Sequence, residues 1–545
     1  MPQTLSYPGV YIDELPSPVH TIIPVPTSVL ALAGRALRGP LDTPVVIHSE
    51  SDFIATFGPL WTQSELGQCV EQYYANGGSD AVIVRVFDKA GHDTFVASPP
   101  GIAIPTTGGG KLTVYANSPG TWFSNVEIVI DYDTRKQPPP AVNTTYAGEF
   151  NLTVRVTETD PVRGTVQLPE EKFRNLTFDK TSPQYVCTVL AADSKFIVAG
   201  SGGLAAGDTP VNNASAPVGY TYATNNAGGA PDDGLPLAWT DLVPGINVNS
   251  KHGIYALESA DIFTMLVIPP LSPDEAAAPD RPLDTATWAA INAYCTARRA
   301  MAFVDPQSTW IDVQTALGAL QAGTVDPLRF DNTVMYFPWI QVPDSLDGNR
   351  PRYFSPSAAV AGRWASIDFS RGIWKSPAGQ EAPLLGVQQL LYKMNDSQNG
   401  DLNPLGINCL RNFPILGSVV WGARTLDGAD AQTSQWKYVA VRRTAYFIEE
   451  SLYRGTKWVV FEPNDEPLWS QIRLNVDSFM RSLFSQGAFQ GATPKDAYFV
   501  RCDSNTTKQS DIDMGVVNIL VGFAPLKPAE FVVIKISQIV AETVL

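Results

Sequence analysis

The chain of 545 residues is long enough for three or four domains of roughly 150 residues each, and 44% of its residues are apolar, enough to fill several hydrophobic cores. The 44 prolines and 42 glycines favour a loop-rich architecture that contains β-structure over a helical bundle. The net charge of −16 argues against a protein that binds nucleic acid, because phosphate binding requires clustered Lys and Arg.

Residues 1–26 are predicted to form an extended N-terminal arm. Six prolines exclude a helix here, and Val10, Tyr11 and Ile12 favour a strand that has no partner nearby in the sequence. The segment lacks the basic and apolar regions of a signal peptide, and the chain contains no stretch of about 18 apolar residues that could span a membrane. We therefore expect folding in the cytoplasm and no direct membrane insertion.

Residues 27–91 have the pattern of a βαβ unit. Two apolar runs, SVLALAGRA (28–36) and DAVIVRVF (80–87), favour buried strands, and SELGQCVEQYYANGG (64–78) favours a helix that ends at a glycine. The pattern resumes over 251–394, with predicted strands at 262–270, 301–305 and 332–340 and a helix at 285–300. These two segments are predicted to form one split α/β domain with a parallel sheet.

Residues 92–250 between the two halves are predicted to be an inserted β-rich outer domain. Short alternating strands are expected at 111–116, 126–132, 150–158 and 195–200, separated by loops rich in Pro, Gly and Asn. An insertion at this place is physically reasonable, because exposed loops between strands and helices tolerate added chain.

Residues 395–528 are predicted to form a C-terminal α+β domain. A long helix is expected over 434–455, a strand over 457–463, a second helix from Pro467 after Asn464 or Asp465 as its cap, and two strands at 497–502 and 515–523. Residues 529–545, which contain EFVVIKISQIV, are predicted to be a C-terminal strand arm.

Eight segments in this order resemble the contractile tail sheath family. The resemblance is strongest over the first 15 residues and over 330–545, and weakest in the insertion. The segments are YPGVYIDEL (7–15), YFPWIQV (336–342), SPSAAVAGRWASIDFSRGIWKSPAG (355–379), LNPLGINCLRNFP (402–414), VVWGARTL (419–426), YVAVRRT (438–444), WVVFEPND (458–465) and APLKPAEF (524–531).

The resemblance implies a structural protein rather than an enzyme. It implies a subtilisin-like α/β middle domain, an inner domain that faces a tube, and stacked hexameric rings that contract to drive the tube through a target envelope. The implied partners are further copies of the chain, the inner tube protein, the baseplate and terminator or cap proteins, within a virion tail or tail-like injection particle assembled in a bacterium.

The two terminal arms are expected to add strands to the sheets of neighbouring subunits. A lone strand leaves N–H and C=O groups unpaired, and joining a sheet edge satisfies them. Pairing within the same subunit is the alternative that the sequence leaves open. The residues expected to make the contacts are Tyr7, Val10, Tyr11, Ile12, Phe531, Val533, Ile534 and Ile536.

The helix predicted from Pro467 is a candidate for contact with the tube. Arg473, Asp477 and Arg481 recur every four residues on its polar face, so the two arginines could meet acidic groups of a tube protein. The alternative is a solvated face with internal Arg–Asp pairs, which is the commoner arrangement.

The alternatives to a structural polymer are a subtilisin-like hydrolase, active or degenerate, and a surface-binding module. A catalytic triad needs a histidine between a nucleophile and a carboxylate, and only His20, His48, His92 and His252 are available. None lies in a recognisable catalytic motif, and GGGK (108–111) lacks the remainder of a phosphate loop. The five cysteines are isolated and show no zinc spacing, so we predict free thiols, no metal and no cofactor.

Overall fold

The computed structural model describes residues 20–135, 148–202, 204–211, 229–245, 251–271, 285–531 and 533. The chain divides into two compact units, Pro26–Arg442 and a second unit made of Met1–Val25 together with Arg443–Leu545. This division differs from the predicted boundary at residue 395, because residues 395–442 supply strands that pair with the rest of the first unit.

A six-stranded sheet lies at the centre of the Pro26–Arg442 unit. Its strand order is β13-β12-β11-β1-β3-β2, and every neighbouring pair is parallel except β2 with β3 at one edge. All six residues of β1 are buried, as expected for a parallel strand covered on both faces. The predicted parallel βαβ unit is therefore confirmed. The strands are β1 (Val29–Gly34), β2 (Val45–Ile47), β3 (Asp80–Arg85), β11 (Met265–Val267), β12 (Met301–Phe303) and β13 (Thr333–Val334).

Helices pack on both faces of this sheet. On one face, Val82 and Leu266 share a core with Trp288 of α6. On the other face, the ring of Phe303 lies 4.6 Å from that of Trp364 in α8. The helices around the sheet are α1 (Glu50–Phe57), α2 (Leu66–Ala75), α6 (Thr285–Ala297), α7 (Val313–Gln321), α8 (Ser357–Arg371) and α9 (Asp396–Leu402).

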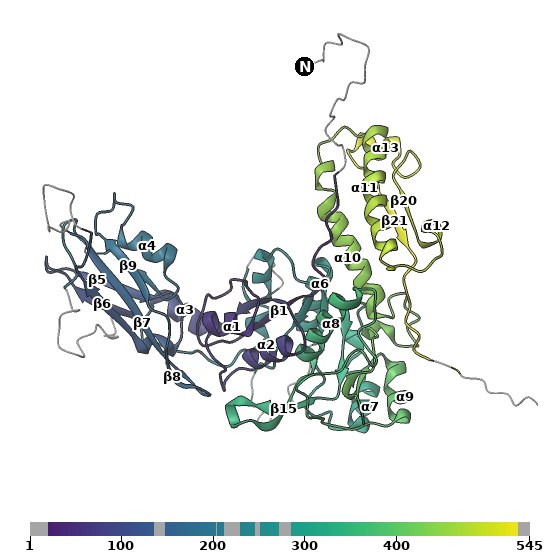
Figure 1. Cartoon of the computed structure of the whole chain (residues 1–545), viewed down its shortest axis with the longest axis horizontal. Coiled ribbons are helices and arrows are strands. Elements are labelled where there is room, and N and C mark those ends of the chain that lie inside the picture. The colour runs from purple at the N-terminus through teal and green to yellow at the C-terminus, as the bar shows by residue number, and fades with distance from the viewer. Residues whose placement is uncertain are drawn as a thin grey trace, which may run out of the picture. The chain divides into compact units, whose positions relative to one another are not determined.

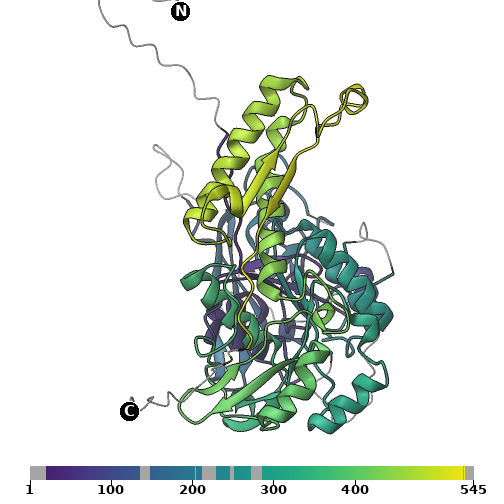
Figure 2. The ribbon, with the colours of Figure 1, turned by 90° about the vertical axis from the view of Figure 1, so that its right-hand side faces the viewer.

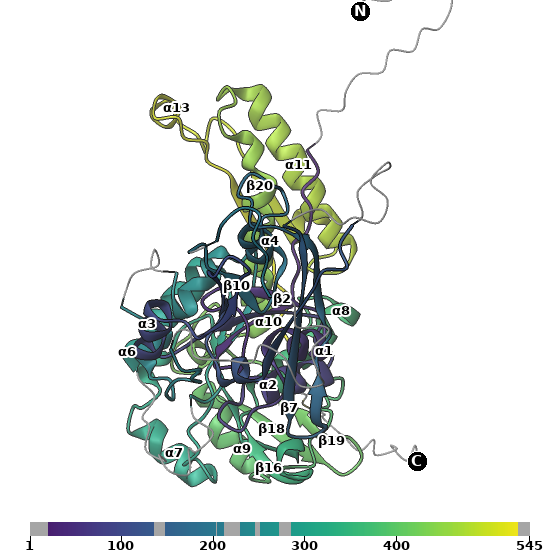
Figure 3. The ribbon, with the colours of Figure 1, turned by 90° about the vertical axis from the view of Figure 1, so that its left-hand side faces the viewer.

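The strand predicted over 332–340 is divided among three sheets. Residues 333–334 form β13 of the main sheet, Tyr336–Phe337 form β14, and β15 begins at Ile340 after Pro338, which has no N–H to donate. In Figure 3, β18 and β19 lie side by side, and β18 also pairs in parallel with β14. The further strands are β15 (Ile340–Asp344), β16 (Arg350–Phe354), β17 (Gln389–Leu390), β18 (Asn408–Phe413) and β19 (Gly417–Val420).

The predicted insertion is a β sandwich with its own core, preceded by α3 (Lys89–Ala97) (Figure 1). One sheet has the order β10-β5-β4, and the other joins β6, β8 and β9 to the long strand β7. Leu237 and Leu242 belong to the core of the main sheet, so the inserted sandwich ends before the predicted residue 250. The elements are β4 (Gly101–Pro105), β5 (Lys111–Ala116), β6 (Val126–Asp131), β7 (Phe150–Asp160), β8 (Gly164–Gln167), β9 (Glu171–Leu176), α4 (Val186–Asp193) and β10 (Ile197–Ala199).

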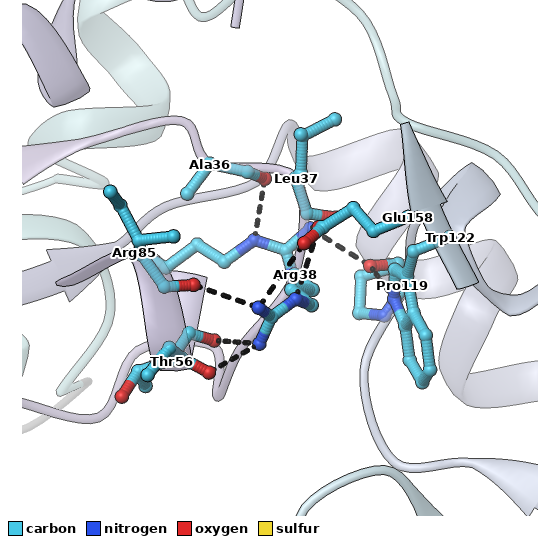
Figure 4. A network of polar contacts seen from close by, with 10 residues as sticks. Ala36, Leu37, Arg38, Thr56, Arg85, Pro119, Trp122 and Glu158 are labelled. Carbon is cyan, nitrogen blue, oxygen red and sulfur yellow. Dashed lines mark hydrogen bonds and ion pairs between the residues drawn. The ribbon is translucent and has the colours of Figure 1, made fainter. Parts of the chain in front are cut away.

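A buried polar network joins the sandwich to the main sheet (Figure 4). Arg38 forms an ion pair with Glu158 of β7 at 3.2 Å and donates to the backbone carbonyls of residues 54–56 at 2.6 to 3.1 Å. Arg85 of β3 donates to four backbone carbonyls, including that of Pro119 at 2.8 Å. Burial lowers the pKa of Arg85 to about 9, so it still carries its charge at neutral pH.

The second unit is built on two long helices, α10 (Val439–Gly455) and α11 (Glu466–Ser485). The Asp465 carboxylate caps α11 by accepting from the Leu468 N–H at 3.1 Å, so the helix begins one residue before the predicted Pro467. One face of α11 is apolar and buried, and its five residues recur at helical spacing. These are Leu468, Ile472, Val476, Phe479 and Leu483.

The predicted strand over 457–463 is wrong. Lys457–Val459 form a 3₁₀ turn, η9, in the short connection between α10 and α11. Strand-forming residues become a strand only beside a partner, and no other strand pairs with this stretch in the described part of the chain. Phe461 is fully exposed at φ 72°, a left-handed conformation that is uncommon for a bulky residue.

Candidate assembly site

The second unit contains a small sheet that is incomplete by itself. β20 (Tyr498–Arg501) and β21 (Leu520–Phe523) pair antiparallel, as Figure 2 shows in yellow, and no third strand joins them within the described residues. An isolated two-stranded sheet is at best marginally stable in water. Both outer edges therefore present backbone N–H and C=O groups to which another strand can bind.

One face of this sheet is covered and the other is open. On the covered face, the Tyr498 hydroxyl donates to the Asp477 carboxylate of α11 at 3.0 Å. On the open face, the side chains of Phe499 and Leu520 are 44% and 49% exposed, and the Arg501 guanidinium lies 5.2 Å from the Phe499 ring. The sheet could thus accept both strands at its edges and apolar side chains on its face.

Only part of the two predicted arms falls within the described residues. Phe531 and Val533 are 75% and 78% exposed. The predicted contact residues that lie outside the described residues are Tyr7, Val10, Tyr11, Ile12, Ile534 and Ile536.

The last residues of the predicted N-terminal arm that the structure describes, 20–25, run along α10. The His20 ring stacks on Trp458 at 4.2 Å, and the Val25 N–H donates to the Ser451 hydroxyl at 3.2 Å. A Cβ added at Gly455 would lie 2.7 Å from the Ile22 side chain, so only glycine allows this close approach. The arm therefore enters the same unit that holds β20 and β21.

The structure gives the three predicted tube-facing residues different surroundings. Arg473 is occupied within the subunit, since it pairs with Glu466 at 2.6 Å and donates to the Cys502 carbonyl. Arg481 and Asp477 lie 4.0 Å apart and remain 67% and 48% exposed. Internal pairing thus accounts for Arg473, and the exposed pair is what the helix offers to a partner.

The described histidines form no catalytic triad. His48 lies 2.7 Å from Asp80, whose other oxygen accepts from the Ser79 hydroxyl, so the carboxylate and not the histidine occupies the middle position. His252 lies 2.9 Å from Asp42 on the surface. No cluster of three or more His, Cys, Asp or Glu side chains that could hold a metal occurs among the described residues.

No helix in the described part of the chain is long and apolar enough to cross a membrane. The exposed loop at Val460 and Phe461 was not predicted, although both residues lie within the segment WVVFEPND (458–465). The signal available was Glu-Pro-Asn-Asp (462–465) directly after them, because such residues favour a turn over a continuing strand.

Comparison with known proteins gives consistent matches. Residues 271–426 match the phage tail sheath protein central domain, and residues 431–539 match the phage tail sheath C-terminal domain. The tail sheath protein of Burkholderia phage BcepMu is 24% identical over 89% of this chain and 87% of its own length. A putative prophage major tail sheath protein of Pseudomonas aeruginosa is 27% identical over 36% of this chain and 48% of its own.

Two solved structures show the same fold. The sheath complex of the extracellular contractile injection system PVC, in its contracted state, is 22% identical, with a TM-score of 0.56 over 99% of both chains. A sheath tail protein from Listeria innocua is 12% identical, with a TM-score of 0.54 over 92% of this chain and 95% of the other.

Proposed function

Since the chain belongs to the contractile tail sheath family, we propose that it is a structural subunit that polymerises as stacked hexameric rings around an inner tube and contracts to drive that tube through a target envelope. The observation that carries the proposal is the incomplete sheet of β20 and β21 in the unit that both chain ends enter. Strands from neighbouring copies would complete it and link the rings.

The arms are the proposed links. Residues 7–15 and 531–540 would each add a strand beside β20 or β21 of a neighbour, so that backbone hydrogen bonds hold the lattice while whole subunits rotate. Such a mesh needs no nucleotide to contract if the extended state is metastable and the contracted state buries more surface. Relatives solved in a contracted state make this mechanism reasonable.

The proposed partners follow from the same assembly. We propose that α11 faces the tube through Asp477 and Arg481, and that rings bind a baseplate at one end and terminator or cap proteins at the other, without nucleic acid. The six-stranded sheet covered by helices supports the expectation of a subtilisin-like middle domain, and the histidine geometry supports a role without catalysis. The chain would assemble in the bacterial cytoplasm into a phage tail or tail-like particle.

Electron microscopy of the purified full chain tests the proposal. We expect hollow cylinders from the full chain, and their loss in a variant that lacks residues 1–15. Ile12→Pro, which removes an N–H donor from the arm, should also abolish cylinders, whereas the matched variant Ile12→Ala should keep most of them. Cylinders that survive both the deletion and the proline would show that the arm does not link the subunits.

A further inference from the structure

Residues 20–25, which we call the strap, lie along α10 without forming a helix or a strand (Figure 1). Ile22 and Val25 hold the strap there, since they are only 5% and 8% exposed. They meet Gly455 and Ser451, which lie one turn apart on the same face of α10 because they are spaced i, i+4. The strap is thus a short extended segment seated on one face of a helix.

Few interactions hold the strap on α10. Its backbone makes one hydrogen bond among the described residues, from the Val25 N–H to the Ser451 hydroxyl. The His20 ring stacks on Trp458, while the side chain of Ile23 is 76% exposed. Segments with few buried side chains and few backbone hydrogen bonds open before the rest of a fold. The strap is therefore able to leave α10 while the helices of the second unit stay packed.

The docked strap leaves the N-terminal arm short. Only residues 16–19 separate the strand proposed at 7–15 from the strap, and four residues span about 14 Å when fully extended. Release of the strap lengthens this linker to residues 16–25, which span about 35 Å. For comparison, α11 with its 20 residues is about 30 Å long. The docked linker is thus shorter than half of this one helix, whereas the released linker is longer than the whole helix.

We propose that the strap is an autoinhibitory contact. Docked on α10, it keeps the arm too short to link copies of the chain, and undocked, it lets residues 7–15 reach the β20–β21 sheet of a neighbour. The inference rests on the proposed function, because it concerns the arm that links the subunits. An added strand makes several backbone hydrogen bonds, more than the single one that the strap gives up, so binding to the neighbour favours release.

A disulfide between the strap and α10 tests the proposal, in the pair Ile22→Cys with Gly455→Cys. A Cβ at position 455 would lie 3.0 Å from the Cβ of Ile22, so a shift of about 0.5 Å reaches the distance of roughly 3.5–4.5 Å that a disulfide needs. All variants carry Cys187→Ala, because the Cys187 thiol is only partly buried. Mass spectrometry of peptides verifies the cross-link.

The oxidised double variant should form no cylinders, and reduction should restore them. Each single variant, kept under the same oxidising conditions, is the matched control and should form cylinders. Equal yields of cylinders from the oxidised and the reduced double variant would overturn the proposal. Failure of the original chain to form cylinders would instead contradict the proposed function, and the strap is then tested on dispersed chains.

Thiol labelling of the dispersed full chain measures release without cylinders. Ser451→Cys places a thiol of similar shape beneath the strap, at a position that is 0% exposed. The native Cys502, equally buried in the same unit, reports opening of the unit as a whole. We expect the thiol at position 451 to react about ten-fold faster than Cys502 or more.

Two neighbouring side chains of the strap provide a matched pair of variants for this labelling. Ile22→Ala should raise the rate at position 451 by about ten-fold or more, because it removes a buried anchor. Ile23→Ala, at the exposed side chain, should leave the rate unchanged. Equal rates at positions 451 and 502, or equal effects of the two alanine variants, would show that the strap does not open by itself and would overturn the proposal.

Discussion

Replacing Arg38 by Met should loosen the attachment of the β sandwich to the main sheet. The substitution keeps the aliphatic stem but removes the charge that faces Glu158, which is 8% exposed, and the donors to residues 54–56. Breaking a buried ion pair by removing one partner costs about 3–5 kcal/mol, because the remaining charge stays buried without compensation. The equilibrium constant for local opening between the sandwich and the main sheet should therefore rise by about 100-fold or more.

Hydrogen exchange measured by mass spectrometry on peptides from β7 (Phe150–Asp160) reports this opening locally. Arg155→Met is the matched control on the same strand, because Arg155 forms a half-exposed pair with Glu170 that is worth about 1 kcal/mol or less. We expect fast exchange for Arg38→Met and nearly unchanged exchange for Arg155→Met.

A double variant examines the physical reason. Arg38→Met with Glu158→Leu removes both charges, so it should restore slower exchange than Arg38→Met alone, since a buried pair can often be replaced by apolar groups at little cost. Two results would show that the buried pair does not hold the sandwich in place. One is exchange in the double variant as fast as the effects of Arg38→Met and Glu158→Leu added together, and the other is the same exchange rate in Arg38→Met as in Arg155→Met.

Three further predictions concern stability and exposure. Trp364→Ala should lower the unfolding free energy by about 3–5 kcal/mol in denaturant titrations. Phe369→Ala on the same helix, at a side chain that is 97% exposed, should change the unfolding free energy by less than about 0.5 kcal/mol. Burial raises the pKa of Cys409 to about 12. The thiol therefore contributes stability that is complete below about pH 8.5 and is lost as the pH rises from there toward 12. An unfolding free energy that stays constant above about pH 8.5 in the original chain and falls in Cys409→Ala would contradict this. Cys187, which is only partly buried, should react with a thiol reagent before the four buried cysteines, as mass spectrometry of labelled peptides can determine.

Local signals in the sequence were sufficient where burial and capping decide the structure. The unbroken apolar run at 29–34 predicted a parallel strand, because a strand covered on both faces needs no polar alternation. The start of α11 was predicted to within one residue, because Asn464 and Asp465 are both good cap residues and Asp465 is the one that caps the helix.

Partners that are distant in the sequence explain what could not be predicted. Residues 457–463 have strand-forming side chains, but no strand among the described residues pairs with them. The strand-forming residues 332–340 are continuous in the sequence, yet they contribute to three different sheets. Residues 20–25 were predicted as part of the arm, but only the fold shows that Ile22 packs against Gly455 of α10.

Helical reconstruction by cryo-electron microscopy of cylinders formed by the full chain, at a resolution that shows individual strands, tests whether the arms link the subunits. We expect density for residues 7–15 of one subunit as an added strand at the outer edge of β20 or β21 in a neighbour. A lattice in which β20 and β21 gain no strand from another copy would contradict it.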